Sequence, residues 1–194
     1  MAVERLIGRS MAAGRPGPLS TAVRLTHCDV AWAGRGNYAA LTIYATDTEI
    51  RNCRIHDNAF RAIHLDGAGL APVLADTQIQ NNGEFAIYQT TVDMTPTYQG
   101  VGMSGNGTDA VVIPGGTVHR AVTIDGSPAA LSGASPLITA TITVAGDGAL
   151  TVAPGSTLRF AYGTELNVSD GGWLTAQGTP TAGIAFTSAA APQQ

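Results

Sequence analysis

Residues 149–179 read ALTVAPGSTLRFAYGTELNVSDGGWLTAQGT, a stretch in which both glycines and apolar residues recur. The apolar residues return every eighth position, at Ile142, Leu150, Leu158, Leu166 and Leu174. Two positions after each lies a second, mostly apolar residue, and glycine-rich turns separate the pairs. Each octet therefore predicts a short alternating strand followed by a turn. A phosphate-binding loop needs its glycines clustered once, between a strand and a helix, so these glycines indicate turns.

The alternation within each octet also predicts which side chains face the core. Neighbouring side chains of a strand point to opposite sides, so Leu158 and Phe160 are expected to point inward. Leu158 and Leu166 are expected to be fully buried, each packed against its equivalents one coil away. The outward positions are Thr151, Arg159 and Asn167.

Upstream of residue 125 the repeat lengthens to 24 residues, which is three octets. The same class of residue returns at this spacing in several columns: Asn58, Asn82 and Asn106; Ala62, Ala86 and Ala110; Ile63, Ile87 and Val111; Ile55, Ile79 and Met103; Ile50, Leu74, Tyr98 and Val122. A unit of three short strands and three turns at a fixed period is typical of one coil of a parallel β-solenoid. Each residue then stacks on its equivalent in the next coil, at the roughly 4.8 Å spacing of paired strands.

The sequence therefore predicts an all-β protein, a parallel β-helix with three short strands and about 24 residues per coil. At that period the 194 residues give about eight coils and a rod roughly 40 Å long. Right-handed winding is expected, because parallel crossover connections are right-handed in nearly all cases. The alternative is an ordinary β-sandwich, which also shows short, regularly spaced strands but does not require residue classes to return every 24 positions.

The chain is expected to divide into two parts. Residues 1–20 form an N-terminal segment, which is a candidate cap for the first coil because it contains a short amphipathic stretch. Residues 21–194 form the β-helix domain, with 24-residue coils to about residue 125 and regular octets from about residue 140.

The composition narrows the function classes. Only 12% of the residues are charged, the net charge is −4, and every basic residue is an arginine. This balance offers no electrostatic footprint for nucleic acid or for an anionic membrane surface. No run of eighteen apolar residues is present, so no membrane insertion is expected. The first twenty residues lack the long apolar core of a signal peptide, so we expect no export signal in this chain.

Three stretches carry a resemblance to a known family: LTHCDVAWAG (25–34), TEIRNCRIHDN (48–58) and ADTQIQNNGEFAIY (75–88). They resemble the right-handed parallel β-helix, or pectin-lyase-like, repeat of secreted and cell-surface bacterial proteins. Residues 150–188 are similar to the segment that often follows this repeat in large cell-surface β-helix proteins. The resemblance implies the fold over residues 25–188, with an extracellular or cell-surface location. It implies no single activity, because the family includes lyases, hydrolases, epimerases, adhesins and scaffolds.

Three asparagines, Asn58, Asn82 and Asn106, occupy one column of the 24-residue repeat. We expect them to form a structural ladder rather than an amide-lined sugar site, because stacked asparagines hydrogen-bond one another and the turn backbone. Cys28 and Cys53 share another column, at a spacing that a disulfide accepts. A disulfide and stacked free thiols are both compatible with that spacing, and the packing of cysteine as a small buried residue favours thiols. No metal-ligand spacing is present, so no metal or other cofactor is expected.

The densest polar patch is RIHDNAFRAIHLDG, residues 54–67. It contains the candidate catalytic residues Asp57, His64 and Asp66, and Glu84 lies about one coil later. A glycoside hydrolase needs two carboxyl groups facing the scissile bond. A polysaccharide lyase needs carboxylates that bind calcium and a basic residue that takes a proton. Stacking could bring the three carboxylates together, but they occupy different phases of the coil, and a solvated polar face explains them equally well.

Two functions therefore remain. The favoured one is a non-enzymatic structural or self-assembly module of an extracellular or cell-surface protein, stacking head-to-tail as tandem repeats or filament subunits. The stretch GIAFTSAAAPQQ (183–194) stops straight after an apolar strand and has no capping device, which suggests that another coil lies beyond it. The alternative is a carbohydrate-active β-helix that binds or cleaves an extracellular polysaccharide. The expected partners are a second or tandem copy in the first case and a polysaccharide in the second.

Overall fold

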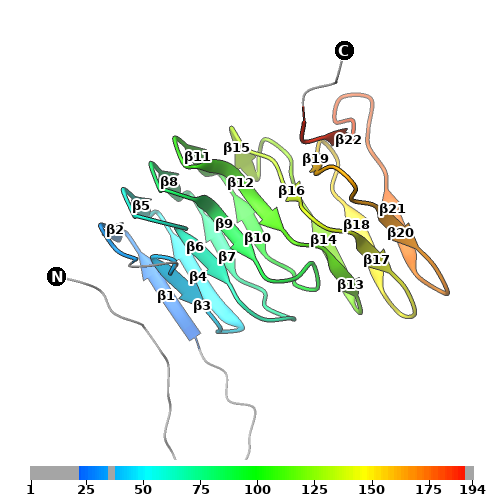
Figure 1. Cartoon of the computed structure of the whole chain (residues 1–194), viewed down its shortest axis with the longest axis horizontal. Helices are drawn as coiled ribbons and strands as arrows, with labels where there is room; N and C mark the ends of the chain where they lie inside the picture. The colour runs from blue at the N-terminus through cyan, green and yellow to red at the C-terminus, as the bar shows by residue number, and fades with distance from the viewer. Residues whose placement is uncertain (1–21, 35–37, 191–194) are drawn as a thin grey trace, which may run out of the picture.

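The protein is an all-β parallel β-solenoid of about seven turns, each of about 24 residues. The computed structural model describes residues 22–34 and 38–190, and every regular element in them is a strand. Figure 1 shows strands of successive turns stacked side by side along the long axis of the molecule. The N-terminal segment 1–20, the candidate cap, lies outside the described residues.

Each coil contains three strands, except the fifth, which contains four. Coil 1 contains β1 (Ala22–Thr26), β2 (Asp29–Ala31) and β3 (Leu41–Ile43). Coil 2 contains β4 (Asp47–Arg51), β5 (Arg54–His56) and β6 (Ile63–Leu65). Coil 3 contains β7 (Val73–Ala75), β8 (Gln78–Gln80) and β9 (Phe85–Gln89), and coil 4 contains β10 (Thr97–Gln99), β11 (Val101–Ser104) and β12 (Thr108–Ile113).

The second half of the solenoid contains three further coils. Coil 5 contains β13 (Gly116–Val118), β14 (Ala121–Ile124), β15 (Leu131–Ser132) and β16 (Leu137–Ile138). Coil 6 contains β17 (Ile142–Val144), β18 (Ala149–Val152) and β19 (Thr157–Phe160). Coil 7 contains β20 (Leu166–Val168), β21 (Trp173–Ala176) and β22 (Ala185–Ser188).

All pairs between these strands are parallel, and their register follows the sequence repeat in coils 2 to 4. Ile55 pairs with Ile79, which pairs with Met103, in steps of 24 residues. The β-sandwich alternative is therefore wrong, because it needs antiparallel ladders. The structure describes about seven coils over residues 22–190, whereas the expected eight counted all 194 residues, and the length of single coils varies around 24. Ala121, for example, pairs with Ala149, 28 residues further on.

The solenoid changes its cross-section between coils 4 and 5. Sheet C, in the order β3-β6-β9-β12-β16-β19-β22, runs through all seven coils. Sheet A (β1-β4-β7-β10) ends in coil 4, and sheet B (β2-β5-β8-β11) continues only into the two-residue strand β15. Sheet D (β13-β17-β20) and sheet E (β14-β18-β21) begin in coil 5. The expected column from Tyr98 to Val122 is therefore not a ladder pair: Tyr98 pairs with Leu74, and Val122 pairs with Leu150.

Single residues in the left-handed backbone region form two rows of corners. One row follows the strands of sheet A and consists of His27, Asn52, Asp76 and Gly100; the other follows those of sheet B and consists of Trp32, Asp57, Asn81 and Gly105. Asparagine, aspartate and glycine adopt positive φ at low cost, so these residue types turn the chain within one position. In coil 1 the same conformation is adopted by His27 (φ 55°) and Trp32 (φ 57°), and it is unfavourable for the bulky tryptophan.

The interior is a continuous apolar core formed by the inward columns. Leu158 is fully buried, as expected, and packs in the same core as Ile138, Leu150 and Val152. Leu166, which was also expected to be fully buried, is only half-buried. The reason is its position in β20, the last strand of sheet D, where a coil covers it on one side only.

Candidate functional site

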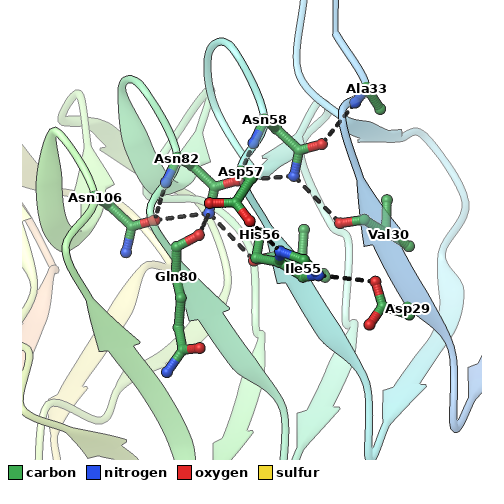
Figure 2. A network of polar contacts seen from close by, with 10 residues as sticks. All are labelled: Asp29, Val30, Ala33, Ile55, His56, Asp57, Asn58, Gln80, Asn82 and Asn106. Carbon is green, nitrogen blue, oxygen red and sulfur yellow. Dashed lines mark hydrogen bonds and ion pairs between the residues drawn. The ribbon is translucent and has the colours of Figure 1, made fainter.

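The asparagine column lies at the corner that follows the strands of sheet B, and Figure 2 shows its three side chains in line. The Nδ2 group of Asn58 donates to Oδ1 of Asn82 at 2.7 Å, and Asn82 donates in the same way to Asn106, also at 2.7 Å. Oδ1 of Asn82 also accepts the backbone N–H of Asn58 at 3.2 Å, and Oδ1 of Asn106 accepts the backbone N–H of Asn82 at 3.0 Å. The amides of Asn58 and Asn82 are buried, so these bonds satisfy polar groups that water does not reach.

Both ends of this ladder are closed by groups other than asparagine. Asn106 Nδ2 donates to Oδ1 of Asp109 at 2.6 Å, and the backbone N–H of Asn106 donates to the same oxygen at 3.0 Å. The carboxylate of Asp109 thus replaces the next rung. At the other end Asn58 Oδ1 accepts the backbone N–H of Ala33 at 2.8 Å. Each Nδ2 group thus donates toward the next coil, in a series that ends at the carboxylate of Asp109, and also donates to a backbone carbonyl of the preceding coil: Val30, Ile55 and Ile79. The amides of the ladder are therefore used within the structure and are not free for a ligand.

His56, on β5, lies between two carboxylates and has little exposure (Figure 2). Its Nδ1 is 2.6 Å from Asp57 Oδ2, and its Nε2 is 2.9 Å from Asp29 Oδ1 on the neighbouring strand of coil 1. An ionised carboxylate only accepts hydrogen bonds, so both contacts are satisfied when both ring nitrogens carry a proton. The arrangement joins coil 1 to coil 2, and no hydroxyl or thiol side chain contacts His56 within the described residues.

A second polar cluster lies on the outer face of sheet C and is named here the sheet C cluster: Arg61, His64, Glu84, Phe85 and Tyr88. Arg61 Nε donates to Glu84 Oε2 at 2.7 Å, and its guanidinium carbon lies 4.5 Å from the centre of the Tyr88 ring. Tyr88 also stacks on Phe85 with 5.7 Å between ring centroids and makes a T-shaped contact with His64, with 5.3 Å between centroids. The cluster is therefore packed against itself, with much of the Tyr88 ring occupied by its neighbours.

His64 is the least satisfied member of the sheet C cluster. Its Nε2 atom is buried and has no hydrogen-bond partner. Burial lowers the pKa of His64 below its ordinary value of 6.5, and the nearby charge of Arg61 lowers it further, while Asp66 opposes the shift. The neutral imidazole is therefore the form that the fold prefers.

The carboxylates proposed as catalytic candidates have different partners. Asp57 contacts His56, and Glu84 contacts Arg61. Asp66 follows β6, has no ion pair among the described residues, and acts on His64 only through its charge. Two of the three carboxylates are therefore held in ion pairs with basic side chains rather than with each other.

The cysteines lie in adjacent coils as free thiols, with Cys53 buried and Cys28 half-buried. The backbone N–H of Cys28 points to the Cys53 sulfur at 3.4 Å, and the Cys53 thiol donates to the carbonyl oxygen of Arg51 at 3.2 Å. Burial raises the pKa of the Cys53 thiol, which keeps it protonated and slow to react.

One ion pair, between the buried carboxylate of Asp93 and the half-exposed Arg120, was not predicted from the sequence. Asp93 is buried in the loop between β9 and β10, and both its oxygens lie 3.2 Å from Arg120 Nε. The backbone N–H of His119 donates to the same carboxylate at 3.1 Å. Arg120 also fills the space beside Gly69, where an added Cβ would lie 2.5 Å from its Nη1. The ion pair links the loop that connects coils 3 and 4 to coil 5. The 24-residue repeat does not predict this ion pair, because neither Asp93 nor Arg120 recurs at the equivalent position of a neighbouring repeat.

Neither a candidate metal site nor a candidate membrane-spanning helix is found in the described part of the chain. It has no group of three or more metal-ligating side chains, and it contains no helix with the length and apolar character needed to cross a bilayer. Comparison with known proteins adds no assignment: no family model, no curated protein and no solved structure matches the chain.

Proposed function

We propose that the protein is a structural module of an extracellular or cell-surface assembly and extends by stacking its last coil on the first coil of another solenoid. The second solenoid is a separate copy or a tandem copy in one longer chain. We also propose that it belongs to the right-handed, pectin-lyase-like β-helix class, on the sequence stretches quoted above. Neither proposal gives the chain an enzymatic role.

The observation that carries the proposal is the exposure of core columns in coil 7. Val144 is 0% exposed, and its ladder partner Val168 is 45% exposed. Leu150 is 1% exposed and its partner Leu174 38%, while Leu158 is 1% exposed and its partner Phe186 46%. Side chains that form the core one coil earlier thus form an apolar surface in coil 7.

The backbone of coil 7 points to the same kind of partner. Its strands β20, β21 and β22 are each the terminal strand of a sheet, with a ladder partner on one side only. An open strand edge is satisfied by pairing with another strand. A further parallel coil supplies three strands at the required positions and covers the apolar surface at the same time.

The first coil offers a matching surface within the described residues. The strands β1, β2 and β3 are terminal in their sheets, and the inward residues Val23, Leu25 and Val30 are only half-buried. Coil 7 of one molecule against coil 1 of the next keeps all strands parallel. Because the two surfaces differ, the contact does not close on itself, and separate subunits would form a filament.

The geometry supports polysaccharide binding or cleavage less well than it supports stacking. The sheet C cluster uses its ring faces and charges within the cluster, and Asp57 and Glu84 lie in separate ion pairs. We therefore expect no release of unsaturated or reducing ends from pectin or alginate. Activity that disappears on changing Asp57 or His64 would favour the alternative.

The stacking proposal is tested by sedimentation velocity over a concentration series, with the parent chain compared with the double variant Leu174→Lys/Phe186→Lys. Both residues are exposed in the monomer, so the charges should leave the fold intact while preventing stacking. The parent should form species that lengthen with concentration, and the double variant should sediment as a monomer with an unchanged circular dichroism spectrum.

The control is Tyr162→Lys, which places one lysine on a fully exposed residue in the turn between β19 and β20, away from the apolar surface of coil 7. This variant should associate as the parent does. A parent chain that stays monomeric at every concentration would contradict stacking between separate subunits, and equal loss of association in all variants would show a non-specific charge effect.

A further inference from the structure

A groove interrupts one side of the solenoid at the junction between coils 4 and 5. It has a volume of about 270 Å³ and is lined by Thr95, Pro96, Thr97, Tyr98, Thr123 and Asp125. The lining thus includes residues of β10 and of β14, the two strands at which sheets A and E end (Figure 1). A cavity of about 10 Å³ shares Pro96, Tyr98, Thr123 and Asp125 with the groove, and most of its other lining residues belong to the apolar core.

The wall formed by β10 presents unused backbone groups to this groove. The N–H of Thr97 donates to Pro72 O at 2.8 Å, and Gln99 O accepts from Asp76 N–H at 2.8 Å, so both residues pair toward β7. Alternate residues of a parallel strand pair with opposite neighbours. The N–H and C=O of Tyr98, between them, therefore face the groove.

The opposite wall, formed by β14, has the same property. Arg120 O accepts from Ala149 N–H and Ile124 O accepts from Ala153 N–H, both at 3.0 Å, which directs these positions toward β18. By the same alternation the backbone groups of Thr123 face the groove. Among the described residues, no hydrogen bond joins β10 to β14.

We propose that this groove binds one extended peptide strand, which pairs with β10 on one side and with β14 on the other. The bound strand would make sheet A continuous with sheet E. Backbone donors and acceptors on both walls favour a peptide over other ligands, because an added strand offers the complementary groups at the spacing of a β-ladder.

The residues that line the groove also limit which side chains the bound strand can carry. Side chains alternate across a strand, and those directed inward meet a cavity with room for about one water molecule, so they must be small, such as alanine. Asp125 is the single charged residue of the groove lining, which favours an arginine or lysine at one end of the peptide. The partner is therefore an extended segment with alternating small residues and a terminal basic residue.

The binding test uses a fluorescein-labelled peptide of sequence Thr-Ala-Thr-Ala-Arg and measures fluorescence anisotropy against the full chain. We expect saturable binding. The same peptide with its internal backbone nitrogens methylated should bind at least about tenfold more weakly, because its strand donors are removed. No saturation up to about 1 mM protein, or equal binding of the methylated peptide, would overturn the proposal.

Variants of the chain identify the site. Thr123→Pro removes the N–H that faces the groove and leaves the β18 ladder donors, so it should weaken binding at least about tenfold. Asp125→Asn should weaken binding of the arginine peptide but not of one ending in threonine. If Thr123→Pro fails to fold, the methylated peptide still tests strand pairing. The Leu174→Lys/Phe186→Lys variant should bind as the parent does, which separates this site from the stacking surface.

Discussion

Asn82 is the middle residue of the asparagine ladder. Its side chain accepts a hydrogen bond from Asn58 and donates one to Asn106. In Asn82→Ala, the side-chain and backbone N–H groups of Asn58 lose their acceptor in a buried corner. An unsatisfied buried donor costs roughly 1–3 kcal/mol, so we expect a loss of about 3 kcal/mol in the free energy of unfolding, measured in urea. Gln78→Ala, on the exposed face of the same coil, should change it by less than about 0.5 kcal/mol.

His64 provides a pH-dependent contribution to stability whose sign follows from its lowered pKa. The unfolded chain binds a proton near pH 6.5, and the folded chain does so only at lower pH. Stability should therefore be complete above pH 6.5 and decrease as the pH falls below that value toward the folded pKa. His64→Phe keeps an aromatic edge against Tyr88 without titrating.

The measurement for His64 is the difference in unfolding free energy between His64→Phe and the parent across pH 5 to 8. The variant should lose part of the decrease that the parent shows below pH 6.5. Identical pH profiles would mean that the imidazole is as easily protonated in the folded chain as in the unfolded one.

At the scale of the strand and its corner, Trp32 is the residue least suited to its conformation. Its equivalents Asp57, Asn81 and Gly105 tolerate positive φ, whereas tryptophan at φ 57° is strained, and its side chain is largely exposed. We expect Trp32→Asn to stabilise the chain by about 0.5–1 kcal/mol in urea unfolding. Tyr44→Asn, an exposed aromatic without positive φ, should not do so, and a stabilisation as large there would refute the explanation.

The elements also show what the sequence could predict. The inward columns and the asparagine row recur at a fixed period, so strand identity, register and the corner of the ladder followed from spacing alone. The change of sheets at β13 and β14 did not, because coil length varies there and period counting fails once residues are inserted. The pairs His56–Asp29 and Arg120–Asp93 also depend on which side chains turn toward each other across coils, and no repeat encodes that.

At the scale of the whole molecule, the loss of stability caused by a charge in the core should depend on whether neighbouring coils cover that position on both sides. Leu158→Asp places an unpaired charge in a fully covered column and should abolish cooperative folding. Leu166→Asp lies in half-open coil 7, so the charge reaches water and coils 1 to 6 should stay folded. Hydrogen exchange distinguishes the two cases. The comparison is made in a dilute, monomeric sample, where protection lost throughout the chain in Leu166→Asp would indicate that coil 7 is essential to the fold.

The central claim is that solenoids stack end to end, and its most direct test is electron cryo-microscopy of the concentrated parent chain. Coil 7 on coil 1 continues the ladder of seven strands in sheet C, so the axial repeat should be about seven times 4.8 Å, or about 34 Å per subunit. We predict filaments with this repeat and with strands perpendicular to the filament axis. Isolated monomers, or assemblies in which solenoids contact one another side by side, would contradict the account.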